Sequence, residues 1–192
     1  MTVAGAFVVS PVVHGDRRGS FHEWYRADLL EGLTGGGFAA HAPAIAQANC
    51  SVSRAGSLRG IHFSEVPPGQ AKYVTCFAGA VLDVVVDLRT GSPTYGAWDS
   101  VLLDDVDRRC VYLSEGLGHA FVALADGSLV SYLVSTGYAP EREHSIDPFD
   151  PVLAISWPTA DRDGRPLELT MSERDRSAPS LAEVRASGLL PS

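Results

Sequence analysis

The chain has little positive charge, and almost none of it comes from lysine. Lys72 is its only lysine, and arginine supplies the rest of the 15 basic side chains. The formal net charge of -8 argues against nucleic acid or an anionic membrane as the main partner. It still allows an anionic small molecule in a locally positive pocket. No apolar run approaches the length of a membrane span.

Cysteine is also scarce. The three cysteines, Cys50, Cys76 and Cys110, are odd in number and widely spaced. This pattern predicts reduced, mostly buried thiols in a cytoplasmic protein, and neither a disulfide framework nor a zinc site. Residues 1–13 lack a basic start and a small-residue cleavage site, so we expect a first strand there and no signal peptide.

Few segments have a helical pattern, and short β-like runs separated by turn residues dominate. These runs cover 45–53, 57–63, 71–78, 80–88, 95–103, 110–113, 119–125 and 128–135. They predict an all-β fold, a cupin-type jelly-roll β-barrel with short peripheral helices, as a single domain over 1–192. The helices are expected at 26–33, ending at Gly35-Gly36-Gly37, and at 180–187, between Pro179 and Gly188.

In the run 45–53, polar and apolar side chains alternate without exception from Ala46 onward. The polar set either faces solvent, the commoner arrangement in antiparallel sheets, or lines a polar cavity. Arg54-Ala55-Gly56 then predicts a tight turn, with 57–63 as a hairpin partner. The two sets are Gln47, Asn49, Ser51 and Ser53 against Ala46, Ala48, Cys50 and Val52.

Two titratable side chains stand out in neighbouring predicted strands, which we expect to form a hairpin-like pair. His62 faces away from the flanking Ile61 and Phe63, and Lys72 lies ten residues later. Such residues are usually a structural histidine and a solvated edge charge. In a chain that otherwise uses arginine, however, a single lysine indicates a need for a compact ammonium that can lose its proton. Arg59 and His62 differ in strand parity, so we predict a bulge at Gly60 that turns both side chains inward.

Several longer motifs occur in a fixed order: DRRGSFHEWY at 16–25, the run 47–74, the segment 87–98 and SEGLGHAF at 114–121. Together they resemble the dTDP-4-dehydrorhamnose 3,5-epimerase family over nearly the whole chain. The wording is most similar to the branch that makes deoxysugars for antibiotics. The resemblance implies a cupin-type barrel and a homodimer. It also implies metal-free epimerisation, without a cofactor, of a dTDP-4-keto-6-deoxyhexose.

The resemblance assigns four catalytic residues. His62 matches the general base, Asp175 its carboxylate partner, Tyr132 the acid that returns a proton, and Lys72 the ammonium near the C4 oxygen of the sugar. The residue types suit the chemistry. A base that titrates near neutral pH removes a proton next to a ketone, and a nearby cation stabilises the enolate that results.

The resemblance also assigns substrate-binding residues: Arg18, Phe21, Glu23, Gln47, Asn49, Arg59, His119, Tyr138, Glu143 and Arg174. By the same analogy Arg59 binds the diphosphate, since a guanidinium pairs two oxygens at once. Phe21 and Tyr138 would pack on thymine, with ordinary core or rim packing as the alternative. His119 could instead be a histidine that satisfies a turn. Of the remaining histidines, His22 is expected to face away from the site, and His14, His41 and His144 to lie on the surface.

Several readings of the function stay open. Inversion at C3 alone and inversion at C3 and C5 use the same base, and we favour C3 alone. A related dTDP-sugar 3,4-ketoisomerase is an alternative. A metal-dependent cupin enzyme is less expected, because the His-x-His cluster of such proteins is missing. A catalytically silent sugar-nucleotide binder would have no use for His62, Tyr132 and Asp175 together.

Overall fold

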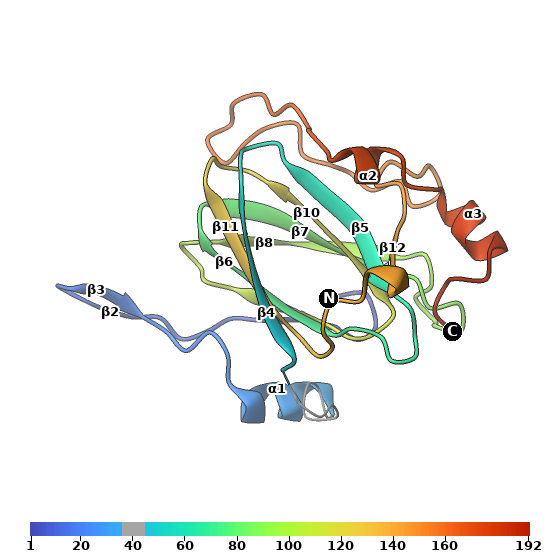
Figure 1. Cartoon of the computed structure of the whole chain (residues 1–192). Helices are drawn as coiled ribbons and strands as arrows, with labels where there is room; N and C mark the ends of the chain where they lie inside the picture. Colours follow the sequence, from blue (N-terminus) through green and yellow to red (C-terminus); the bar gives the residue numbers. More distant parts are fainter. Residues whose placement is uncertain (36–44) are drawn as a thin grey trace.

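Two five-stranded antiparallel sheets pack against each other in a computed structural model that describes residues 1–35 and 45–192 (Figure 1). One sheet has the strand order β1-β9-β6-β11-β4 and the other β12-β5-β10-β7-β8. The strands of the first sheet are β1 (Ala6–Val9), β9 (Cys110–Leu113), β6 (Lys72–Ala78), β11 (Ser128–Val134) and β4 (Gln47–Ser53). Those of the second are β12 (Glu143–Ser145), β5 (Leu58–Ser64), β10 (Leu117–Ala123), β7 (Ala80–Asp87) and β8 (Trp98–Asp104).

The predicted all-β jelly-roll class is confirmed, and each of the eight predicted runs contains a strand. The apolar faces of both sheets meet in a core of valine, leucine and phenylalanine side chains such as Val74, Val85 and Phe121. Burying such side chains on the shared inner faces is the main force that holds two sheets together. The core therefore fixes the strands that carry His62, Lys72 and Tyr132. β5 lies on one side of the space between the sheets, and β6 and β11 lie on the other.

Both predicted hairpins are wrong. β4 pairs with β11, and β5 pairs with β10 and β12, so the turn at residues 54–56 carries the chain from one sheet to the other. β6 likewise belongs to the sheet opposite β5. Short sequence spacing suggested pairing, but the consecutive strands β4, β5, β6 and β7 alternate between the two sheets. The side chains of β5 and β6 consequently face each other across the interior.

The predicted irregularity at Gly60 is present. In the β10–β5 ladder His119 is opposite His62 and Phe121 is opposite Arg59, so β5 has one residue more than its partner there. Gly60 has φ +116, and a Cβ on it would lie 2.6 Å from the Cβ of Ala120. Only glycine fits such a position without strain. The bulge allows Arg59 and His62 to line the same cavity.

In residues 1–35 and 45–192, three short α-helices and a 3₁₀ turn, Pro140–Arg142, lie outside the sheets (Figure 1). α1 (Ala27–Thr34) ends at Gly35 in the left-handed conformation, close to the prediction, and Gly36 and Gly37 lie outside the described residues. α3 (Leu181–Ala186) lies within the helix predicted over 180–187, and a capping box between Ser180 and Glu183 begins it. The sequence did not predict α2 (Glu173–Arg176), which carries two of the candidate site residues.

The N-terminal part of the chain includes a hairpin of β2 (His14–Asp16) and β3 (Gly19–Phe21) that projects from the barrel (Figure 1). All six residues of its two strands are exposed. We call residues 14–23 the arm. A two-stranded hairpin is only marginally stable by itself, so its hydrophobic side chains gain stability only by packing on another surface.

The motif at residues 87–98 organises a loop at one edge of the second sheet. The carboxylate of Asp87 accepts hydrogen bonds from the side chains of Arg89, Ser92 and Thr94. Burial alone would raise the pKa of Asp87, but these bonds hold it at about 2. No residue of 87–98 lines either of the two cavities that contain the candidate site residues, and the bonds to Asp87 indicate a structural role for this motif.

Cys76 and Cys110 are buried as expected, whereas Cys50 is exposed on β4. In the described residues, no helix is both long and apolar enough to cross a membrane.

Candidate active site

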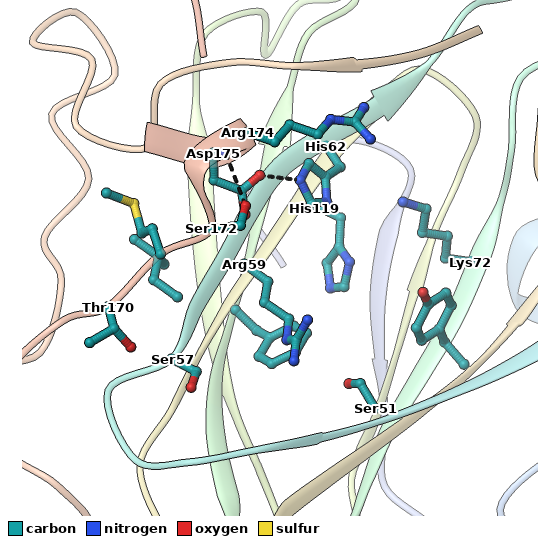
Figure 2. Close-up of a pocket in the computed structure, with 14 residues that line it drawn as sticks. Ser51, Ser57, Arg59, His62, Lys72, His119, Thr170, Ser172, Arg174 and Asp175 are labelled. Atoms are coloured by element: carbon teal, nitrogen blue, oxygen red, sulfur yellow. Dashed lines mark hydrogen bonds and ion pairs between the residues drawn. The ribbon is translucent and has the colours of Figure 1, made fainter. Parts of the chain in front are cut away.

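A cavity of about 460 Å³ opens between the two sheets, and His62 lies in its wall (Figure 2). The imidazole Nε2 of His62 is 2.6 Å from Oδ1 of Asp175, which approaches from α2. The His62 side chain is 35% exposed and that of Asp175 only 5%, so the carboxylate is behind the ring. When Nε2–H donates to Asp175, Nδ1 keeps its lone pair and can accept a proton.

The position of Asp175 is fixed by the first turn of α2. Ser172 caps this helix, and its hydroxyl accepts a hydrogen bond from the backbone N–H of Asp175 at 3.1 Å. Burial would raise the pKa of the Asp175 carboxyl. The hydrogen bonds from His62, Ser172 and the backbone of Gly60 outweigh burial and hold its pKa below the ordinary value. Asp175 is therefore an anion that stabilises a protonated His62.

The opposite sheet contributes Lys72 from β6 and Tyr132 from β11. Lys72 is opposite Val134, and Tyr132 is opposite Val74, so the two side chains are diagonal neighbours on one face. Lys72 is only 8% exposed. Burial lowers its pKa, although the charges of Glu143 and Asp83 act in the other direction. Burial likewise raises the pKa of the Tyr132 phenol, so it stays protonated at neutral pH.

The polar side chains of β4 face inward. Gln47, Asn49 and Ser51 are half-buried, whereas Ala48 and Val52 on the other face are exposed, Val52 by 63%. Of the two readings of this alternation, the cavity-lining one is correct. The amide of Gln47 donates to Oδ1 of Asn49 at 2.6 Å, which orients both side chains.

A second cavity, of about 360 Å³, adjoins the first. Both are lined by His62, Lys72, Tyr132 and Arg174. The second cavity adds Gln47, Asn49, Gln70, Tyr138 and Glu143 to this lining. Three of the four candidate catalytic residues, His62, Lys72 and Tyr132, therefore lie where the two cavities meet. This arrangement suits a ligand with two chemically different ends.

Three further predicted residues line the first cavity. Arg59 donates from Nε to the hydroxyl of Ser53 at 3.2 Å, which holds the guanidinium beside β4. His119 is 7% exposed and bonds through Nε2 to Asp83 at 2.8 Å. Arg174 lies at the rim and donates to the backbone carbonyl of Glu143 at 3.0 Å. The site thus places two arginines and one lysine around a cavity in an acidic protein, as binding of an anion requires.

The profile of the dTDP-4-dehydrorhamnose 3,5-epimerase family matches residues 1–183 of this chain. The chain belongs to this family. It is accordingly an isomerase.

Members of this family are similar to this protein over the whole length of the chain. The dTDP-4-dehydrorhamnose 3,5-epimerase of Mycolicibacterium smegmatis is 55% identical over 192 residues, which cover 100% of this chain and 89% of that protein. A solved 4-keto-6-deoxy sugar epimerase from the novobiocin biosynthetic gene cluster of Streptomyces spheroides is 49% identical, with a TM-score of 0.90 and coverage of 100% and 90%. A 3'-monoepimerase from Streptomyces bikiniensis, solved in complex with dTDP-quinovose, is 47% identical, with a TM-score of 0.90 and coverage of 100% and 91%.

All the residues that the resemblance assigns line one of the two cavities or contact a residue that does, except those of the arm. Arg18, Phe21 and Glu23 line neither cavity. Phe21 is 65% exposed, and among the described residues Arg18 forms an ion pair with the nearby Asp16 alone. Within one chain, the arm is therefore separate from both cavities.

Two buried residues that bind predicted site residues were not themselves predicted from the sequence. Asp83 binds His119, and Ser53 binds Arg59. A signal for Asp83 was available, since it is the one acidic residue inside the otherwise apolar run 80–86. Ser53 gave no signal beyond its place on the polar face of 45–53.

The remaining histidines are distributed as follows. His14 is exposed, and His22 is half-buried on the arm, away from both cavities. His144 is not a plain surface residue, because it is half-buried and bonds to Glu65 at 2.8 Å. His41 lies outside the described residues. In residues 1–35 and 45–192, no three His, Cys, Asp or Glu side chains form a group that could hold a metal ion.

Proposed function

We propose that this protein inverts C3 of dTDP-4-keto-6-deoxy-D-glucose through an enolate, in the biosynthesis of a deoxysugar for an antibiotic or other secondary metabolite. The observation that carries the proposal is that the candidate base and acid come from opposite sheets. His62 is on β5 and Tyr132 on β11, and both line the same cavity. A sugar ring held between the sheets would present one face to each residue. Inversion requires removal of a proton from one face and delivery to the other.

In the proposed mechanism Nδ1 of His62 accepts the C3 proton. The electron pair of the C–H bond forms the C3–C4 double bond, and the carbonyl pair moves to the C4 oxygen. Lys72 stabilises this oxygen as it becomes negative, and Asp175 stabilises the imidazolium. Tyr132 then delivers its phenolic proton to C3 on the other face, while the C4 carbonyl re-forms. Return of the proton from His62 to Tyr132 through solvent completes the cycle.

The nucleotide end is assigned to the second cavity and its rim. Gln47 and Asn49 offer amide groups that suit thymine or ribose, and Tyr138, which is 61% exposed, offers a ring face for stacking. Arg174 lies where the cavities meet, a suitable place for the diphosphate. Arg59 and His119 line the first cavity, where the sugar and the adjoining phosphate would lie, and Glu143 lines the second. The antibiotic-sugar assignment is supported by the relative from the novobiocin cluster, and the C3 assignment by the 3'-monoepimerase.

The test is to incubate the protein with dTDP-4-keto-6-deoxyglucose in deuterated water and to locate the deuterium by NMR. Deuterium at C3 alone is the expected result, and deuterium at both C3 and C5 would identify a 3,5-epimerase instead. A carbonyl that moves from C4 to C3 would identify a 3,4-ketoisomerase. Absence of exchange would refute the epimerase proposal. Metal analysis of the purified, active protein tests the metal-dependent alternative.

Tyr132→Phe is expected to separate exchange from inversion. The variant keeps His62 and Lys72, so the C3 proton still exchanges with solvent, but no phenol delivers a proton on the opposite face. We expect inversion to fall about 10²-fold or more and exchange to fall much less, in line with the usual contribution of a general acid. Solvent exchange and the new stereochemistry at C3 are measured in one NMR time course. Equal loss of both rates would show that Tyr132 is not the acid.

We further propose a homodimer in which the arm of each chain completes the cavity of its partner. The arm carries Arg18, Phe21 and Glu23 away from their own cavities, and β4 is an edge strand with an exposed apolar face. A second copy that covers both would bury apolar surface and bring the arm next to a cavity lined by Gln47 and Asn49.

Complementation tests this arrangement. The variants Arg18→Ala and His62→Asn are each expected to be inactive or weak. When they are mixed after dissociation, about a quarter of the wild-type activity should return, since half the dimers are mixed and each holds one intact site. Sedimentation should show dimers that Val52→Glu dissociates, whereas Val106→Glu, at a similarly exposed turn position, leaves them intact. A fully active monomer would refute the proposal.

A further inference from the structure

The cavity contains a second histidine–aspartate pair beside the first. His119 on β10 is directly opposite His62 on β5, so both side chains leave the same face of the sheet. Each bonds through Nε2 to its own aspartate, His62 to Asp175 at 2.6 Å and His119 to Asp83 at 2.8 Å. Both histidines line the first cavity.

The two pairs differ in burial, and this difference indicates different tasks. The His62 ring is 35% exposed, whereas the His119 ring is 9% exposed and Asp83 is fully enclosed. A base that exchanges protons with water needs access to solvent. A pair enclosed at the base of a cavity is better suited to hold a fixed hydrogen-bond donor or charge.

The two carboxylate oxygens of Asp83 differ in their hydrogen bonding. Its Oδ2 binds His119, while its Oδ1 is buried and has no hydrogen-bond partner in the described residues. The negative charge of Asp83 acts on Lys72, which projects into the same cavity from the opposite sheet. A buried carboxylate with a free oxygen is costly unless a cation or a donor is nearby. His119 is the donor that binds Asp83, and Lys72 is the cation on which its charge acts.

We propose that Asp83 is a positioning residue of the epimerase, which acts through His119 and Lys72 to set the donors around the C4 oxygen of the substrate. It directs the free ring nitrogen of His119 into the cavity and keeps Lys72 as an ammonium. The His62–Asp175 pair removes the proton, and the His119–Asp83 pair supports the place where negative charge develops. The inference rests on the proposed function, because it takes the ketone of the sugar as its reference point.

The first test is Asp83→Asn, which keeps the shape of the side chain and a carbonyl acceptor for His119 but removes the charge. We expect kcat for C3 exchange to fall about 10²-fold, the usual effect of losing one preorganised electrostatic contact. The affinity for dTDP alone, measured by calorimetry, should stay within about threefold, because the nucleotide end lies in the second cavity. A kcat close to that of the wild type would overturn the inference.

A pH profile separates positioning from a merely structural role. Asp83 raises the pKa of Lys72, so its removal should move the alkaline loss of activity to lower pH. Glu143 on β12 also acts on Lys72 and is kept. The other titratable groups that line the first cavity are kept as well, namely Arg59, His62, His119, Tyr132, Arg174 and Asp175. Asp150→Asn is the matched control. Asp150 is 2% exposed and accepts from the backbone N–H of Val152, Leu153 and Leu181, so its loss should lower stability without moving the profile.

The wild type is measured first, so that the two proposals fail separately. A wild type that exchanges no deuterium at C3 refutes the proposed function itself. An active wild type with an unchanged profile in Asp83→Asn refutes only the positioning role. If Asp83→Asn does not fold, as judged by its thermal melt, His119→Gln replaces it. This variant should lower kcat and leave the alkaline limb in place, since Asp83 still faces Lys72, and full activity of His119→Gln would again overturn the inference.

Discussion

His62→Asn is expected to abolish proton exchange at C3, with a loss of about 10²–10⁴-fold, which is the usual range for a general base. Asparagine has no nitrogen that can accept a proton at neutral pH, although its amide can still donate to the buried Asp175. The fold and the nucleotide end should be little changed. The measurement is deuterium incorporation at C3 in single-turnover reactions, together with binding of dTDP.

His144→Asn is the matched control for this variant. His144 is also a half-buried histidine that bonds to a carboxylate, that of Glu65 at 2.8 Å, but it lines neither cavity. We expect its replacement to leave exchange within about twofold, as for most substitutions outside a site. Residual exchange in His62→Asn comparable with this control would show that another group, such as His119, is the base.

The alternation in residues 45–53 shows how far local pattern reaches. It predicted a strand and its two faces, because side chains alternate with a period of two. It did not decide which face is inside, because that depends on what the rest of the chain packs there. Here the polar face lines the same cavity as Lys72 and Tyr132, with Asn49 directly paired to Tyr132 in one sheet, and the apolar face of Ala48 and Val52 is exposed in the single chain.

Which strands pair with each other could not be predicted from the sequence, for a related reason. The turn after Ser53 was predicted, but a tight turn fits a hairpin as well as a crossing between sheets. The bulge at Gly60 was predictable because it followed from a conflict within one strand, namely that Arg59 and His62 both had to face inward. A requirement placed on one strand can be read locally, whereas a choice between partner strands depends on contacts far apart in the sequence.

The role of Asp83 could not be predicted from the sequence motifs. Its neighbours in β7 are apolar and buried, so the strand itself was easy to predict. The importance of this carboxylate becomes visible only when β10 brings His119 to 2.8 Å and the opposite sheet brings Lys72 into the same cavity. The hydrogen bond to His119 and the electrostatic effect on Lys72 link Asp83 to residues that are 36 and 11 positions away and lie on two other strands.

Lys72→Arg is expected to lower kcat about 10²–10³-fold, comparable with the loss of one group that stabilises an oxyanion. The substitution keeps one positive charge, so its effect reports on shape and hydration. The side chain is only 8% exposed and lies against Tyr132, so the larger, planar guanidinium must displace a neighbour or enter the space of the substrate. The affinity for dTDP alone should change little, because the interaction that is lost is with the sugar and not with the nucleotide.

A pH profile of Lys72→Arg gives the second part of this prediction. Burial lowers the pKa of Lys72, so the wild type should lose activity on the alkaline side at a lower pH than an ordinary lysine would allow. Arginine stays protonated throughout this range, so the residual activity of the variant should lack that alkaline limb. Arg162→Lys, which exchanges the same residue types in an exposed pair with Asp105, is the matched control and should behave as wild type. Normal turnover by Lys72→Arg would mean that a positive charge of any shape suffices at the C4 oxygen, and that the single lysine of this chain carries no chemical requirement.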